Sequence, residues 1–216
     1  MDFLKIEGGN PLTGEVNVSG AKNAALPIIA SGLMVDGTLS LDNVPDLADT
    51  RFMIELISKL GMEVKKSGDN IEISGNVNKY SAPYDLVKQM RASILVLGPL
   101  LSKFGYAKVS LPGGCAIGTR PVDLHIKTMQ SLGAIVELAD GYIQAKASKG
   151  LKGSKIVFPF ISVGATENAI MAAVFANGIT EIINAAKEPE VEDLANCLNS
   201  MGAKISGQGT NNILIE

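Results

Sequence analysis

Three long stretches of the chain are almost continuously apolar and rich in the helix-favouring residues Ala, Leu and Met. They cover Ala21–Val35, Tyr84–Phe104 and Ala165–Ala176. After each stretch a glycine precedes a short run with strand character, at Thr38–Leu41, Ala107–Leu111 and Ile179–Ile183. A helix that is apolar on every side is normally buried. The pattern therefore predicts three buried helices, each followed by a strand.

A second pattern repeats with a similar spacing. Helical segments end at Gly61, Gly133 and Gly202, about 70 residues apart, and glycine suits the left-handed backbone just past a helix end. An alternating strand and a polar turn follow each glycine, and the returning strands are Ile71–Ser74, Tyr142–Ala147 and Asn212–Glu216. Chance recurrence of one common helix ending is the alternative. Because the glycines after the apolar stretches and the glycines at the second helix ends recur with nearly the same spacing, we favour three βαβαββ units in an α/β protein. Its buried helices would be surrounded by sheets.

The composition narrows the class of protein. Of 216 residues, 46% are apolar and 19% are charged, with a net charge of −3, which excludes a disordered chain and disfavours a nucleic-acid surface. Two cysteines cannot form a disulfide scaffold, and one histidine with two distant cysteines offers no metal-ligand spacing. Glycine-rich motifs for ATP or NAD are missing from the sequence. We therefore expect no metal, no cofactor and no nucleic-acid partner.

The N-terminus and the apolar stretches bear on the compartment. Residues 1–7 carry neither a basic start nor an apolar run, so we expect no signal peptide. Ala24–Val35 and Ala92–Leu101 are the most apolar stretches, and both fall far short of the roughly 20 residues that span a bilayer. With its thiols expected to be reduced, the chain is predicted to be cytoplasmic and to have no membrane partner.

The most unusual local sequence surrounds Cys115, between Leu111 and Pro121. Its glycines and prolines exclude helix and regular strand, so we expect a mobile loop. The nearby Arg120 would favour the thiolate, which makes Cys115 a candidate nucleophile or proton donor on a lid. An exposed thiol without a role is the alternative. Cys197 occupies an apolar position of a helical pattern and is expected to be an inert core thiol.

Other positions point to anion binding. Lys22 and Asn23 lie where a turn leads into a helix, and a cation there is unfavourable unless an anion is bound; a solvated lysine is the alternative. The similar helix start at Ser162–Gly164 lacks the lysine and suggests a shared backbone anion site. Arg91 lies within an apolar pattern and needs an anionic partner, either a ligand or a structural carboxylate. We expect His125 to pack the loop rather than to act as a general base.

Several of these segments together resemble the UDP-N-acetylglucosamine 1-carboxyvinyltransferase family, the enolpyruvyl transferases of the first committed step of peptidoglycan synthesis. The cysteine loop in combination with the turn at Lys22 is highly specific. The related shikimate-pathway enolpyruvyl transferase shares the turn with a lysine but not this cysteine loop. The matching segments are Gly14–Pro27, Asp42–Thr50, Leu111–Asp123, Ser162–Asn168, Asn184–Asp193 and Gly202–Ile215. The resemblance implies an inside-out α/β barrel lobe of three βαβαββ repeats, one of two lobes in the family fold.

The resemblance also implies roles for individual residues. Cys115 would be the general acid toward the enolpyruvyl methylene, could form a covalent adduct with phosphoenolpyruvate, and would be the thiol that fosfomycin alkylates. Lys22, Asn23 and Arg120 would contact phosphoenolpyruvate or the tetrahedral intermediate. The UDP-sugar site would comprise Arg91, Arg120, Pro121, Val122, Asp123, Leu124, Ser162, Val163 and Gly164. Many relatives carry a basic residue near position 160, where this chain has Phe160.

The chain resembles the N-terminal half of such an enzyme. Residues 1–21 would form strands that join a second lobe, and residues 22–216 would form the three-repeat lobe. The second lobe, absent here, would supply an aspartate base and further arginines, and it is the expected structural partner. Three functions are consistent with this: transfer of the enolpyruvyl group from phosphoenolpyruvate to the 3-hydroxyl of UDP-N-acetylglucosamine with release of phosphate, a UDP-sugar-binding module, or an interaction lobe that needs a companion chain.

Overall fold

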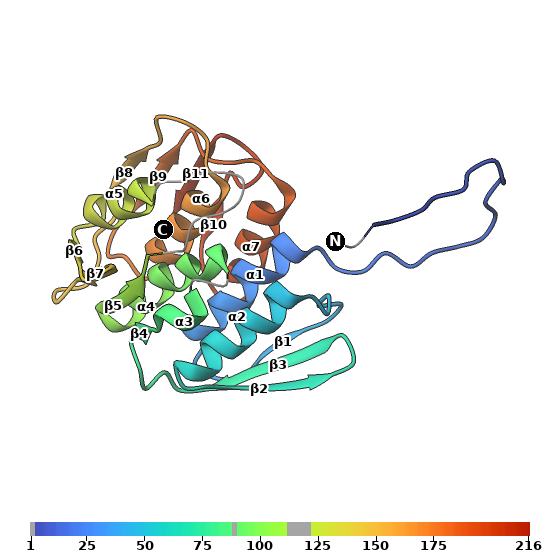
Figure 1. Cartoon of the computed structure of the whole chain (residues 1–216). Coiled ribbons are helices and arrows are strands. Elements are labelled where there is room, and N and C mark those ends of the chain that lie inside the picture. The colour runs from blue at the N-terminus through green and yellow to red at the C-terminus, as the bar shows by residue number, and fades with distance from the viewer. Residues whose placement is uncertain (1–2, 88–89, 112–121) are drawn as a thin grey trace.

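The computed structural model describes residues 3–87, 90–111 and 122–216, which fold into three α/β units around a shared helical centre (Figure 1). The first unit comprises helix α1 (Lys22–Ser31), its 3-10 extension η1 (Gly32–Met34), strand β1 (Leu39–Leu41), helix α2 (Ala48–Lys59), and the hairpin of β2 (Met62–Ser67) and β3 (Asn70–Gly75).

The other two units follow the same order. The second comprises β4 (Ser81–Ala82), α3 (Tyr84–Val87), the 3-10 helix η2 (Arg91–Val96), α4 (Leu97–Phe104), β5 (Tyr106–Ser110), α5 (Asp123–Ser131), β6 (Ile135–Ala139) and β7 (Tyr142–Lys146). The third comprises β8 (Lys155–Val157), α6 (Val163–Ala173), β9 (Thr180–Ile183), α7 (Pro189–Ser200), β10 (Ile205–Ser206) and β11 (Asn212–Ile215).

The sheets confirm the repeat and show where it is incomplete. The second and third units form four-stranded sheets in the equivalent orders β4-β5-β7-β6 and β8-β9-β11-β10, in which the first pair is parallel and the others are antiparallel. The first sheet has three strands in the order β1-β3-β2. Within the described chain, the first unit therefore lacks the strand that should precede α1.

The segment before α1 leaves the body of the molecule as an extended arm (Figure 1). Its residues 3–21 form neither a helix nor a strand. Six large apolar side chains along it are 85–97% exposed, at Phe3, Leu4, Ile6, Leu12, Val16 and Val18. The prediction that residues 1–21 form strands in a second lobe remains a prediction.

The centre of the molecule is helical and the sheets lie at its periphery, as the apolar stretches predicted (Figure 1). Every residue of α6 from Ala165 to Ala173 is buried, as are Leu97–Leu101 of α4 and Ala25–Ser31 of α1. In contrast, α2, α5 and α7 each bury one face and expose the other. Within the described ranges, no helix has the length and apolar character needed to cross a bilayer.

The stretch Tyr84–Phe104 is not one helix, which corrects the sequence-based expectation. It contains α3, η2 and α4, and α4 begins only at Leu97. Pro99 explains this start, because proline has no N–H to donate and is tolerated in the first turn of a helix, where that donor has no intrahelical acceptor. The helix endings were predicted correctly: Gly61, Gly133 and Gly202 have φ values of 118°, 91° and 105°.

Helices α4 and α6 approach each other closely at Gly98 and Asn168. A Cβ atom at Gly98 would lie 2.5 Å from Oδ1 and 2.7 Å from the carbonyl oxygen of Asn168. With only a hydrogen there, the Gly98 N–H donates to Asn168 Oδ1 at 2.7 Å. The small residue therefore determines how near the two helices can lie.

This contact generates a prediction for Gly98→Ala. Alanine is normally the better helix former, but here its methyl group would force α4 and α6 apart, so we expect a loss of about 1–3 kcal/mol in the free energy of unfolding in urea. Gly164→Ala in α6 is the matched control, because its Cβ would meet His125 at an ordinary 3.5 Å. Equal stabilities of the two variants would contradict the packing argument.

Candidate functional site

Four helices begin around one pocket of about 360 Å³. The first turns of α1, α5, α6 and α7 each contribute to its wall, together with η2. Its lining residues are Asn23, Leu26, Arg91, Ala92, Ile94, Leu95, His125, Ser162, Val163, Gly164, Glu167 and Glu190. Because the N-terminal end of a helix carries partial positive charge and N–H groups without intrahelical acceptors, this arrangement favours an anionic ligand.

The start of α6 shows which donors are available. Ser162 is the N-cap residue, and its Oγ accepts the N–H of Ala165 at 3.4 Å. The N–H of Thr166 donates to the Ser162 carbonyl at 3.0 Å. This leaves the N–H groups of Val163 and Gly164 without an acceptor among the described residues, and both residues line the pocket. An oxyanion could accept from both.

Charged side chains on the other walls set the electrostatics of the pocket. Arg91, the first residue of η2, is half-buried and supplies a permanent positive charge. Glu167 on α6 is only 4% exposed. Burial, together with the carboxylates of Glu190 and Glu188, raises the pKa of Glu167 to about 8. At neutral pH the Glu167 side chain is therefore mostly uncharged and does not oppose an anion.

His125 forms another part of the wall from the first turn of α5. It is 8% exposed, and its Nδ1 lies 3.0 Å from Nδ2 of the buried Asn168. Burial lowers the pKa of His125 to about 4, with the Asp123 carboxylate acting in the opposite direction and Arg91 in the same one. The imidazole is therefore neutral at pH 7.

The structure brings together five of the residues predicted to bind substrates: Asn23, Arg91, Ser162, Val163 and Gly164. Lys22 lies in the same turn of α1 as Asn23, but its Nζ pairs with Asp49 Oδ2 of α2 at 2.8 Å. The Asp49 carboxylate is therefore the anion that balances the charge of Lys22 at the start of α1. An anionic ligand that binds Lys22 would have to share Lys22 with Asp49 or replace Asp49.

The residues around the start of α5 that were predicted to bind the UDP-sugar lie outside this pocket. Asp123 lies in the first turn and is 3.9 Å from Lys127, one turn further along. Val122 packs against the core, and Leu124 is 4% exposed within it. None of Val122, Asp123 and Leu124 lines this pocket, although all three were expected in the UDP-sugar site.

Of the two cysteines for which the sequence predicts a role, Cys197 lies among the described residues. Cys115, Arg120 and Pro121 lie outside the described residues. Cys197 on α7 is half-buried and packs against the core. Burial raises the pKa of its thiol, and the Asp193 carboxylate raises it further, against a hydrogen bond with Ser31. Cys197 therefore stays protonated at neutral pH, in keeping with an inert thiol.

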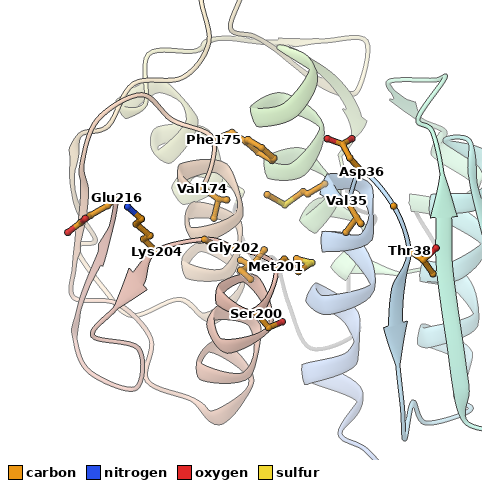
Figure 2. A pocket seen from close by; sticks show the side chains of 14 residues that line it. Val35, Asp36, Thr38, Val174, Phe175, Ser200, Met201, Gly202, Lys204 and Glu216 are labelled. Atoms are coloured by element: carbon orange, nitrogen blue, oxygen red, sulfur yellow. The ribbon is translucent and has the colours of Figure 1, made fainter.

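A larger pocket of about 750 Å³ lies at the opposite ends of the helices (Figure 2). Its walls include Val174 and Phe175 after α6, Ser200 and Met201 at the end of α7, and Asp36 beyond η1. The C-terminal ends of helices carry partial negative charge, which disfavours an anion. Despite its greater volume, this pocket is the poorer candidate for a phosphorylated ligand.

Sequence reasoning did not identify Glu167 and Glu190 as residues that line this pocket, and it expected His125 to pack the loop. Glu167 stands among small apolar residues of a buried helix, the same signal that had singled out Arg91. For His125 and Glu190 the sequence offers no such signal, since each lies in an ordinary amphipathic helix. In the described part of the chain, no three His, Cys, Asp or Glu residues lie close enough to hold a metal ion.

Comparisons with known proteins agree with this fold. The family model for EPSP synthase (3-phosphoshikimate 1-carboxyvinyltransferase) matches residues 6–216. Among solved structures, the enolpyruvyl transferase NikO from Streptomyces tendae superposes with a TM-score of 0.81 at 23% identity, over 96% of this chain and 49% of that one. EPSP synthase from Acinetobacter baumannii gives a TM-score of 0.75 at 18% identity, over 94% of this chain and 46% of that one. These two structures establish the fold.

Curated relatives are closer in sequence. UDP-N-acetylglucosamine 1-carboxyvinyltransferase of Acidiphilium cryptum is 53% identical over all 216 residues, and that of Shewanella pealeana is 56% identical over 218 aligned residues. Both alignments cover 100% of this chain and 52% of the relative, so the chain spans about half the length of these proteins. The chain therefore belongs to the EPSP synthase family of carboxyvinyl transferases, and its curated relatives within that family are UDP-N-acetylglucosamine 1-carboxyvinyltransferases.

Proposed function

We propose that this chain is the substrate-binding lobe of a cytoplasmic enzyme of peptidoglycan synthesis, which transfers the enolpyruvyl group of phosphoenolpyruvate to the 3-hydroxyl of UDP-N-acetylglucosamine and releases phosphate. The observation that carries the proposal is the convergence of Asn23, Arg91 and the N–H groups of Val163 and Gly164 on one pocket at the helix starts. Both substrates are anionic, so they suit these donors. The named activity of the curated relatives adds support.

In the proposed reaction, the 3-hydroxyl oxygen of the sugar gives its proton to the aspartate base expected in the second lobe and adds to C2 of phosphoenolpyruvate, while the Cys115 thiol protonates the C3 methylene. In the tetrahedral intermediate the C3–H bond then breaks, with its proton returning to the Cys115 thiolate, and the C2–oxygen bond to phosphate breaks, which leaves the enolpyruvyl ether and free phosphate. Lys22, Asn23 and Arg120 hold phosphoenolpyruvate and the intermediate, and Arg91 with Ser162–Gly164 holds the UDP-sugar. Lys22 releases Asp49, or shares it, when phosphoenolpyruvate binds.

The chain alone is proposed to lack part of the catalytic machinery. The resemblance assigns an aspartate base and further phosphoenolpyruvate-binding arginines to a second lobe, which would correspond to the additional half of the curated relatives. Two features support such a lobe as the structural partner: the exposed apolar side chains of the arm, and the first sheet with three strands in place of four. Residues 22–216 would then form one lobe, and residues 1–21 would add strands to the other.

The central test measures phosphate release from phosphoenolpyruvate in the presence of UDP-N-acetylglucosamine. We expect no turnover by the chain alone and turnover when it is fused to the remaining half of the Acidiphilium cryptum relative. Cys115→Ala in the fusion should abolish phosphate release, whereas Cys197→Ala should leave it intact. Fosfomycin should add to Cys115 alone, as read by peptide mass mapping.

Three results of this test would count against the proposal. A fusion that folds and binds UDP-N-acetylglucosamine without turnover would favour a binding module. Turnover by the chain alone would remove the need for a second lobe. Labelling of Cys197 in place of Cys115 would refute the assignment of the reactive thiol.

Arg91 provides a test of the binding site. Charge-assisted hydrogen bonds contribute roughly 1.5–3 kcal/mol each, so Arg91→Ala should weaken UDP-N-acetylglucosamine binding by roughly 10- to 100-fold in calorimetry of the fusion. Arg51→Ala is the matched control, because Arg51 lies on α2, is exposed, and pairs with Asp46 at 2.9 Å. An equal loss of affinity in both variants would indicate that the ligand responds to the overall charge of the protein and not to a specific site at Arg91.

Glu167 gives the pocket a predictable pH dependence. Its raised pKa means that the carboxyl is neutral below about pH 8 and adds a negative charge above it. Affinity for UDP-N-acetylglucosamine should therefore fall as the pH rises through this value, by at most about tenfold per pH unit. Glu167→Gln should remove this part of the decline.

Stability provides a control that needs no ligand. Because the folded pKa of Glu167 lies above the ordinary value of 4.5, the folded state holds the proton more tightly. The free energy of unfolding should therefore decline as the pH rises from about 4.5 to about 8, and Glu167→Gln should flatten this decline. If the variant and the original chain show parallel profiles, Glu167 is not the responsible group.

A further inference from the structure

The buried amide of Asn168 connects α6 to three other segments. Its Oδ1 accepts the N–H of Gly98 at 2.7 Å, and its Nδ2 donates to the carbonyl of Ile94 at 2.9 Å. The same Nδ2 lies 3.0 Å from Nδ1 of His125 on α5. The Asn168 side chain is completely buried, so water does not compete for these bonds.

The chemistry of these partners determines where the histidine carries its proton. A backbone N–H can only donate and a carbonyl can only accept, so Gly98 and Ile94 fix which end of the Asn168 amide is oxygen and which is nitrogen. One Nδ2 hydrogen goes to Ile94 and the other faces Nδ1 of His125. Nδ1 must therefore be the unprotonated acceptor, and the proton of the neutral ring resides on Nε2.

The opposite edge of the ring faces the pocket. His125 lines it, and a Cβ atom at Gly164 would lie 3.5 Å from Cε1 and 3.8 Å from Nε2 of the ring. Among the described residues, no acceptor is bonded to Nε2. The Nε2–H group is therefore available to a ligand at the side of the pocket that Gly164 also lines.

We propose that Asn168 is a positioning residue that holds His125 in its neutral, Nε2-protonated form, so that the pocket presents a fixed N–H donor to a phosphate or hydroxyl oxygen of the sugar nucleotide. The identity of this ligand rests on the proposed function, whereas the state of the ring does not. An anion would ordinarily draw a second proton onto a nearby histidine. Here that proton would have to displace the donor hydrogen of Asn168 from Nδ1.

Charged groups around the ring come from four elements. Asp123 lies on α5 itself, Arg91 on η2, Glu167 on α6 and Glu190 on α7. Burial, opposed by Asp123 and aided by Arg91, lowers the pKa of His125 to about 4. This direction agrees with the hydrogen-bond geometry, because both disfavour the imidazolium form.

The chain contains one histidine, so ring nitrogen signals in NMR need no assignment by mutation. In the chain labelled with ¹⁵N-histidine, we expect long-range proton–nitrogen spectra to show protonated Nε2 and unprotonated Nδ1. We expect no conversion to imidazolium until the pH falls toward about 4. A ring protonated on Nδ1, or a titration near the ordinary value of 6.5, would overturn the proposal.

Asn168→Asp is the informative variant, because a carboxylate of the same shape can only accept from Nδ1. The proton should move to Nδ1, and the titration midpoint of His125 should rise above 6.5. Thr166→Val is the matched control: Thr166 is also fully buried on α6 and accepts the N–H of Ala186, but it is not bonded to His125. A ring unchanged in Asn168→Asp, or changed alike in both variants, would overturn the proposal.

Adding UDP-N-acetylglucosamine to the labelled fusion, in which the His125 signals are identified by their absence from a His125→Gln fusion, separates this inference from the proposed function. We expect the Nε2–H resonance to shift while Nδ1 stays unprotonated. Protonation of Nδ1 on ligand binding would overturn the proposal. An Nε2-protonated ring that does not respond to this ligand would support the role of Asn168 and count against the proposed substrate.

Discussion

The near contact between α4 and α6 is the constraint on which the rest of the structure depends. Without a side chain at Gly98, the two helices lie close enough for the Asn168 amide to be fully hydrogen-bonded in a region that water does not reach. A buried amide without hydrogen-bond partners would destabilise the fold by about 1–3 kcal/mol. The close packing of α4 and α6 therefore makes the hydrogen bonds of Asn168 possible and also makes them necessary. Through these hydrogen bonds the starts of α4 and α5 are held against the middle of α6.

An inside-out arrangement has an electrostatic consequence. Because the buried helices share a direction, their starts gather at one end of the lobe and their ends at the other. The two main cavities therefore differ in the sign of their backbone partial charges, although the whole chain carries a net charge of only −3. The neutral form of Glu167 preserves this polarity at the helix starts, where a charged carboxylate would weaken it.

The threefold repeat and the buried helices were predictable because periodicity and apolar content are local properties of a sequence. The grouping of Asn23 and Arg91 with Ser162–Gly164 was anticipated from the family resemblance, not from the residues alone. The Lys22–Asp49 pair could not be predicted, since it depends on α1 and α2 lying side by side. Pro99 is typical of the first turn of a helix and could have indicated the start of α4. The apolar residues around it favoured the interpretation as one continuous helix.

The role of Asn168 was beyond sequence reasoning for a different reason. Its three partners lie 43, 70 and 74 residues away in the chain. A polar residue in an apolar helix indicates that some partner exists, but only the fold determines which one. The same holds for Glu167, whose pKa is raised by its burial in the fold and by two carboxylates at the start of a neighbouring helix.

The unequal sheets have a consequence for how the chain behaves in solution. Strand β1 lies at an edge of the first sheet, at the position where β5 and β9 each pair with a parallel neighbour. An uncovered strand edge is a template for a strand from another molecule. Together with the apolar arm, it gives copies of this chain a route to domain swapping and aggregation.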